Sequence, residues 1–439
     1  MPKRKYIHII VIALLAFGWG TMATRRQVRS GNDFPIYVEA SRAIVAGESP
    51  YDVGSGLHGY VYPPFFAILI APIAFLPLTA AVWAWYLINV LLTVAAFGLL
   101  RRLLEAHFGP RRARTAVWIA LVVHLRFVLN NYDMGQVNLL TLVMGLAAVW
   151  LAFQRGRYSG AGWLIGASAA IKPYAVVLAL PFLLRGQWRM MGTVLAGWLI
   201  AMVVPPLLVA GPSTTAAMLR DWNEKVILPS AGGRLQGSAT FDQSPQSALR
   251  RLVVDAPAFG ETHVNFVSVS PGTYRLLVRL LQLALLVVFL AALVIGRPWT
   301  TRGERAPPAS EDTAATLNEH SPAAQDPLGL VDIALSFLAT VMLFGYNLKA
   351  HFVVLIVPAS IIAWLVLNER ARIGRVATGL AIVAGVLVFF TAPFLVGRPL
   401  ANWAAAYSAT TLATLLQFGW LVWWKVTYGV RERYPVGHQ

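Results

Sequence analysis

The sequence predicts an all-α, polytopic integral membrane protein, in which a bundle of helices is joined by loops on both sides of the membrane. Hydrophobic residues make up 57% of its 439 residues and charged residues only 13%, which is too little polar surface to cover a soluble chain of this size. Apolar segments of membrane-spanning length recur, and arginine and lysine collect between them. An ordinary soluble domain is therefore excluded.

Composition also excludes several kinds of chemistry. The chain has no cysteine, so disulfides, cysteine-ligated zinc and thiol nucleophiles are impossible. Its net charge of +17 would suit a nucleic-acid partner if the basic residues formed one patch. They are instead scattered between apolar segments, which is typical of loops that fix membrane topology. We therefore expect membrane lipids, and no nucleic acid, among the partners.

The first predicted span covers residues 6–23 and follows three cations within the first five residues. A cleaved signal peptide is the alternative, because Thr21-Met22-Ala23 resembles a small-residue cleavage site. We favour an uncleaved helix. Under either interpretation the segment that follows is exported, so we expect residues 24–79 to form an external loop.

That external segment concentrates acids and aromatic residues in a chain that is otherwise poor in acids. Asp33 and Asp52 lie among tyrosines between residues 31 and 64, a combination that suits a sugar-handling site. Residues 34–47 have one apolar face, which predicts a short amphipathic helix at the membrane interface. Residues 63–77 are apolar but interrupted by prolines and shorter than the roughly 20 residues of a span, so we expect a re-entrant or juxtamembrane segment.

The later spans follow from apolar runs separated by charged loops. They are expected at about 80–100, 115–130, 137–153, 190–210, 273–295, 328–346, 351–367, 376–394 and 405–424. The segment 160–184 is different, because Lys172-Pro173 lies at its centre. A cation is costly in hydrocarbon and proline breaks the helical hydrogen-bond ladder, so we expect two short helices that meet at Lys172.

The loop cations give a consistent topology. They are expected on the cytoplasmic side, together with both termini, if the segment 160–184 returns to its own side as a broken hairpin. This arrangement has about ten full crossings. We divide the chain into a catalytic membrane module (1–296) that carries a second external loop (211–272), a disordered cytoplasmic linker (297–327) and a C-terminal helical module (328–439).

Several short motifs, in this order, resemble those of a known family. They are DFPIY at 33–37, GESPYD at 47–52, YPPF at 62–65, GQVNL at 135–139 and IKP at 171–173, with weaker matches at Gln243-Ser244, Arg250-Arg251 and His351. Over nearly its whole length the chain resembles the membrane glycosyltransferases with the C-type fold that use polyprenyl-phosphate donors, most closely glycosyltransferase family 87. One departure is Asn347-Leu348-Lys349-Ala350-His351, which lacks a carboxylate that the family often carries there.

The resemblance implies transfer of a hexose, such as mannose, from a polyprenyl-phosphate donor to an extracytoplasmic lipid or glycan hydroxyl, by inverting displacement. Such a reaction needs one carboxylate to accept the acceptor proton and cations to stabilise the leaving phosphate. Asp33 is the expected base. The expected phosphate-binding residues are Lys349, His351, Arg251 and Lys172, and the expected substrate-binding residues are Tyr37, Asp52, Tyr62, Gln136, Asn138 and Gln243.

Each of these residues also has a purely structural interpretation. Asp33 would then be a solvated loop acid, Lys172 would satisfy backbone carbonyls at a helix break, and Lys349 would snorkel. Gln136 and Asn138 would only cap a helix. Asp33, Asp52 and His58 are hard metal ligands on one loop, but nothing fixes their spacing, so we expect no metal and no other cofactor.

Two other classes of function fit a polytopic chain. A secondary transporter or a flippase for lipid-linked sugars would also have many spans and a broken, charge-bearing helix. Transporters usually show internal repeats and carry charges near the midplane, whereas this chain shows no convincing repeat and its acids lie in an external loop. A scaffold without chemistry has no sequence feature in its favour.

Overall fold

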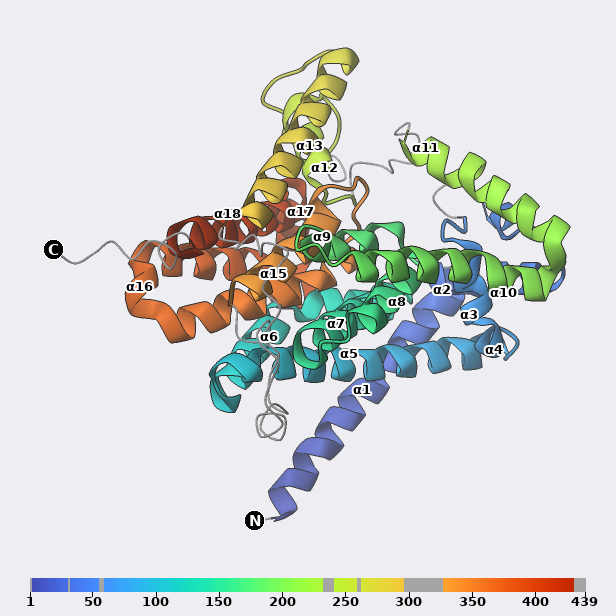
Figure 1. The fold of residues 1–439 in the computed structure, drawn as a ribbon, viewed down its shortest axis with the longest axis horizontal. Coiled ribbons are helices and arrows are strands. Elements are labelled where there is room, and N and C mark those ends of the chain that lie inside the picture. Colours follow the sequence, from blue (N-terminus) through green and yellow to red (C-terminus); the bar gives the residue numbers. More distant parts are fainter. Residues whose placement is uncertain are drawn as a thin grey trace, which may run out of the picture.

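The computed structural model describes residues 2–30, 32–54, 59–231, 241–258, 262–295 and 327–429 (Figure 1). Within these ranges the regular elements are helices, and no β-strand is present. The prediction of an all-α membrane bundle is confirmed. The predicted linker lies outside the described residues except for Pro327, and so does His58.

The N-terminal part begins with a helix that is longer than expected. α1 (Pro2–Ser30) continues past the predicted apolar run, because its last turns carry arginines on an exposed surface, where they favour helix and reach water. α2 (Asp33–Val45) and the 3₁₀-helix η1 (Pro50–Asp52) follow. The proline-rich segment forms two short helices, α3 (Pro64–Leu69) and α4 (Ala71–Ala74). The apolar face of α2 is buried against these elements and α5. The sequence predicted a helix at the membrane interface but not this packing against other helices.

Three long helices form the centre of the bundle. α5 (Leu78–Phe108), α6 (Pro110–Met134) and α7 (Asn138–Arg155) are joined by short turns, and α6 and α7 end at glycines in the left-handed region. The core continues between these helices and α15, α16 and α18, with fully buried Trp364 among its largest side chains.

The predicted broken hairpin is confirmed. α8 (Tyr158–Ala169) ends before Lys172, whose backbone is extended, and the 3₁₀-helix η3 (Pro173–Ala179) and α9 (Leu180–Leu183) follow. The next helix, α10 (Trp188–Trp222), is interrupted at Gly211, whose φ of 77° is not helical, so its first part ends where the span predicted at 190–210 ends. It leads into a π-helix, η4 (Asn223–Ile227), and α11 (Leu228–Ala231), so the predicted external loop 211–272 is partly helical.

The remaining elements include one helix that projects from the bundle (Figure 1). α12 (Pro245–Val253) and this projecting helix, α13 (Pro271–Val294), both begin with a serine that accepts a backbone N–H and with a proline in the first turn. α15 (Pro327–Met342), the 3₁₀-helix η6 (Lys349–Leu355), α16 (Ile356–Phe389), α17 (Pro393–Ala406) and α18 (Ala409–Gly429) complete the fold. α16 is interrupted at Glu369 and Gly374, which separates the two spans predicted at 351–367 and 376–394.

Contacts at one end of the bundle agree with the predicted loop sidedness. Buried Lys425 and Asp332 form an ion pair, and Arg185 donates to the same carboxylate at 3.1 Å. Arg112 donates to Asn368 at 2.8 Å, which joins the start of α6 to the interruption in α16. Loops that were all predicted to be cytoplasmic therefore meet. Six helices in the described ranges are long and apolar enough to cross a membrane, and the count of about ten crossings stays a prediction.

Candidate active site

Asp33 is the first residue of α2 and is held in place by contacts from the end of α6. Asn32 donates its side-chain amide to the carbonyl of Asp133 at 3.1 Å, and Gln27 donates to the carbonyl of Tyr132 at 2.8 Å. These bonds join the α1–α2 corner to the α6–α7 turn. Asp33 itself is half-buried.

The α6–α7 turn requires a glycine. Gly135 has a φ of 68°, and a Cβ there would lie 2.5 Å from the Phe34 Cβ and 2.6 Å from the Gln27 Oε1. Its carbonyl accepts a hydrogen bond from the Trp85 indole at 2.8 Å, and Trp85 stacks on Phe34. This close approach brings Gln136 against α2.

Gln136 connects the carboxylate to a chain of buried polar groups. Its amide nitrogen donates to the Asp33 Oδ2, and its Oε1 accepts from the Tyr62 hydroxyl at 3.3 Å. Tyr37 in turn donates to the Tyr62 hydroxyl at 3.1 Å. Burial, followed by the nearby Asp33 charge, raises the pKa of Tyr62, so this phenol stays a neutral donor.

Asn138 extends the same network to Lys172. The Lys172 ammonium donates to Asn138 Oδ1 at 2.6 Å and lies 5.2 Å and 5.5 Å from the ring centroids of Tyr62 and Tyr174. Amide and aromatic contacts let this cation stay buried, at 3% exposure. The Lys172 ammonium thus bonds a side chain and not a backbone carbonyl, and the N-cap of α7 is Val137 without a side-chain cap. The structure therefore does not show the carbonyl contact and the helix cap that the structural interpretations of Lys172, Gln136 and Asn138 proposed, and their roles in substrate binding stay predictions.

The η6 segment lies beside this network. Asn138 donates to Asn131, whose own amide donates to the carbonyl of Ala350 at 2.8 Å. His351 packs edge-on against the Tyr174 ring, and its Nδ1 accepts the Leu348 N–H at 3.1 Å. The Nε2 of a neutral His351 is therefore the protonated nitrogen and a potential donor.

Three cations gather near the start of η6. Lys349 lies within electrostatic range of Arg126 and Arg251, and His351 lies within that of Lys172. Like charges repel in a buried region, so an anionic ligand would stabilise this arrangement. The predicted phosphate-binding residues are thus near one another, with Arg126 as an addition.

A second buried polar cluster holds Arg251. The Asp242 carboxylate accepts the backbone N–H groups of Ser244 and Asn347, both at 2.8 Å. Arg251 donates to the Asp242 carbonyl and, at 2.9 Å, to the Ser408 hydroxyl. Burial lowers the pKa of Arg251 to about 10, a change that the Asp242 charge opposes, so Arg251 remains cationic at neutral pH.

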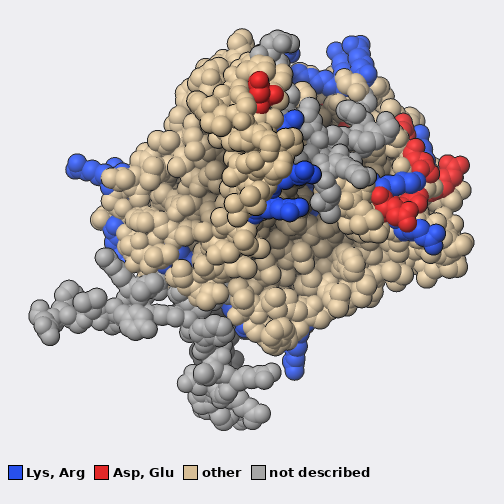
Figure 2. Space-filling model, turned by 90° about the horizontal axis from the view of Figure 1, so that it is seen from above, with Lys and Arg blue, Asp and Glu red and all other residues tan. Residues whose placement is uncertain are grey.

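Two predicted substrate-binding residues lie outside the Asp33 network. Gln243 is fully buried in the second cluster, where its amide donates to the Ala405 carbonyl at 3.2 Å. Asp52 is exposed and pairs with Lys225 at 2.7 Å, and Lys225 also pairs with Asp221 at 3.1 Å. In Figure 2 acidic side chains gather at one edge of the face shown, the edge at which the end of α10 lies in Figure 1.

Sequence reasoning missed two residues between these groups. Tyr346 adopts a φ of 61°, and burial, followed by the charges of Asp33 and Asp242, raises its pKa. It therefore lies within electrostatic range of both carboxylates. Arg126 is buried within α6 and donates to the Thr391 carbonyl. An arginine inside an apolar helix is a sequence signal that could have identified it as a candidate.

Comparison with known proteins gives one family and several distant relatives. Residues 60–317 match the model of Glycosyltransferase family 87. The chain is 31% identical over 163 residues to an alpha-(1->3)-arabinofuranosyltransferase of Corynebacterium glutamicum, covering 36% of this chain and 38% of the relative. It is 27% identical over 187 residues to a polyprenol-phosphate-mannose-dependent alpha-(1-2)-phosphatidylinositol mannoside mannosyltransferase of Mycobacterium tuberculosis, covering 38% and 43%. The chain thus spans about two fifths of the length of these relatives. No solved structure matches it significantly.

Proposed function

Because the chain belongs to glycosyltransferase family 87, we propose that it is a membrane hexosyltransferase that moves mannose from a polyprenyl-phosphate donor to a hydroxyl of a lipid or glycan. The observation that carries this proposal is the Asp33 carboxylate, fixed by Gln136 and joined through Asn138 to the buried Lys172. Mannose is favoured because the mannosyltransferase relatives are named for a polyprenol-phosphate-mannose donor.

The proposed reaction is a direct displacement at the anomeric carbon. The acceptor oxygen forms a bond to that carbon while the bond from the carbon to the phosphate oxygen breaks, and polyprenyl phosphate leaves with the bonding electron pair. Asp33 takes the proton of the acceptor hydroxyl. Asp33 is half-buried, so it can be reached by an acceptor, and the hydrogen bond from Gln136 holds its carboxylate in place.

The leaving phosphate needs positive charge that is already in place. Lys349, with Arg126 and Arg251 nearby, supplies it at the start of η6, and His351 can add a donor at Nε2. An isoprenoid tail is soluble only in the bilayer, so we expect it to lie along the lipid-facing surface of the helices. The neutral hydroxyls of Tyr37 and Tyr62 suit hydrogen bonds to a sugar.

We assign the Asp33 end of the bundle to the extracytoplasmic side, with the arginine-rich loops and both termini in the cytoplasm. Membrane vesicles of known sidedness test this orientation together with the reaction. A short, membrane-impermeant mannoside is added outside vesicles that contain polyprenyl-phosphate mannose, and the mannosylated product is measured by mass spectrometry.

Right-side-out vesicles with the protein are expected to form product, and vesicles without it are not. Product in inside-out vesicles alone would overturn the orientation and leave the activity standing. Absence of product in both, with a phosphatidylinositol mannoside acceptor also unused, would contradict the proposed reaction. Movement of the donor lipid across the bilayer without product would favour a flippase.

A further inference from the structure

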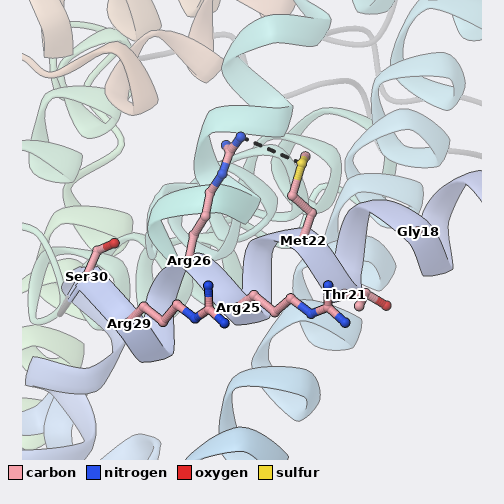
Figure 3. Close-up of a pocket in the computed structure, with 7 residues that line it drawn as sticks. All are labelled: Gly18, Thr21, Met22, Arg25, Arg26, Arg29 and Ser30. Carbon is pink, nitrogen blue, oxygen red and sulfur yellow. Dashed lines mark hydrogen bonds between the residues drawn. The ribbon is translucent and has the colours of Figure 1, made fainter.

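The last turns of α1 line a cavity that the proposed reaction does not use. It has a volume of about 310 Å³ and is lined by Gly18, Thr21, Met22, Arg25, Arg26, Arg29 and Ser30 (Figure 3). Figure 3 shows the side chains of Arg25 and Arg29 extended along one side of the helix, whereas Arg26 turns toward Met22. The cavity is therefore lined by the guanidinium groups of both Arg25 and Arg29.

The three arginines differ in whether a carboxylate balances their positive charge. Arg26 pairs with Asp133 at 2.9 Å. Arg25 and Arg29 are both exposed, and neither forms an ion pair with any residue that the structure describes. Two positive charges thus face the cavity without a negative partner from this part of the chain.

Membrane topology does not explain these charges. Loop cations usually mark the cytoplasmic end of a helix, and α1 already carries Lys3, Arg4 and Lys5 at its opposite end. Arg25 and Arg29 lie instead at the Asp33 end. We assign that end to the extracytoplasmic side, where cations oppose the usual charge bias of membrane topology. A bound ligand is therefore the better explanation of these two arginines.

The surface that leads to the cavity is apolar and open. Leu14 is 64% exposed, and Leu14, Gly18, Thr21 and Arg25 follow one another at the spacing of one helix face. A Cβ on Gly18 would meet no atom within 4 Å. With a rise of about 1.5 Å per residue, Leu14 and Arg25 are roughly 16 Å apart along the axis, a distance that an acyl chain can cover.

We propose that this face of α1 binds an anionic phospholipid of the bilayer, with its phosphate between Arg25 and Arg29 and an acyl chain along Leu14 and Gly18. Guanidinium groups hold phosphate oxygens through charge-assisted, bidentate hydrogen bonds, and the open surface at Gly18 admits a chain. The bound lipid would brace the helix that positions Asp33, four residues beyond Arg29. The proposal concerns binding and does not depend on sugar transfer.

Native mass spectrometry of the purified full chain tests the proposal. Phosphatidylglycerol and phosphatidylcholine with the same acyl chains are titrated separately, and glycerol phosphate serves as the free phosphate without a lipid tail. We expect phosphatidylglycerol to be retained preferentially. Arg25→Gln combined with Arg29→Gln should weaken its binding by roughly tenfold or more, because two charge-assisted contacts are lost. Gly18→Leu should weaken it by blocking the chain.

Matched controls remove the same charge and add the same bulk elsewhere. Arg102→Gln combined with Arg114→Gln removes two exposed arginines from the opposite end, and Gly98→Leu fills an equally open glycine on α5. Both should retain phosphatidylglycerol. Equal binding by the Arg25/Arg29 variant and the unaltered chain, or equal losses in both arginine pairs, would overturn the site. Tight binding of glycerol phosphate would contradict the proposal that the ligand is a lipid. Lipid binding without sugar transfer would reject only the proposed function.

Discussion

Replacing Asp33 by asparagine is expected to lower turnover by roughly 10²–10⁴-fold, the usual contribution of a general base. Asparagine keeps the size of the side chain and its carbonyl can still accept the Gln136 amide, but it cannot take a proton. Donor binding should persist, because the donor is assigned to cations elsewhere. Steady-state rates and donor binding by the purified variant measure the two effects separately.

Asp52→Asn is the matched control for this change. Asp52 is an exposed carboxylate on the same predicted external segment, and it pairs with Lys225, which is not a member of the Asp33 network. Its loss should leave turnover within about threefold, because exposed ion pairs contribute little. A fully active Asp33→Asn protein, correctly folded and inserted, would show that another group accepts the proton.

Replacing Lys349 by alanine is expected to reduce turnover or donor affinity by roughly ten- to hundredfold. A charge-assisted contact to phosphate contributes ~1.5–3 kcal/mol, and each 1.4 kcal/mol is about a factor of ten. Separate values of kcat and KM show whether Lys349 acts on the bound donor, on the developing charge, or on both. Product analysis with a fixed acceptor concentration gives both constants.

Lys225→Ala removes a lysine that pairs with exposed Asp52 and half-buried Asp221, both outside the Asp33 network, so it should leave both constants nearly unchanged. The two lysines thus differ in surroundings and not in chemistry. Unchanged kinetics in both Lys349→Ala and His351→Ala would place the leaving phosphate elsewhere in the protein.

Local chemistry made much of the fold predictable. Lys172-Pro173 cannot sit inside a continuous membrane helix, and the structure has an extended residue at that position. The loop arginines that were assigned to one side meet at one end of the bundle. Helix ends were less predictable, because α1 continues past its apolar run into a part whose arginines are exposed.

The site could be predicted only in part, because its contacts join distant segments. Asp33, Gln136 and Lys172 were each found from local motifs, but their shared network depends on how α2 packs against the α6–α7 turn. Gln243 lies apart from this network, because its amide donates to the Ala405 carbonyl in the second cluster. Tyr346 carried no local signal, because only the fold brings its side chain within electrostatic range of both Asp33 and Asp242.

The most direct test of the central claim is to locate the donor sugar on the chain. A polyprenyl-phosphate mannose analogue with a diazirine on the sugar is photolysed with the purified protein, and the modified peptides are identified by mass spectrometry. Labelling should fall on residues 33–37 and 135–138 and should be displaced by the unmodified donor. Displaceable labelling that falls instead on residues 241–258, with none at 33–37, would contradict the assignment of Asp33 as the base.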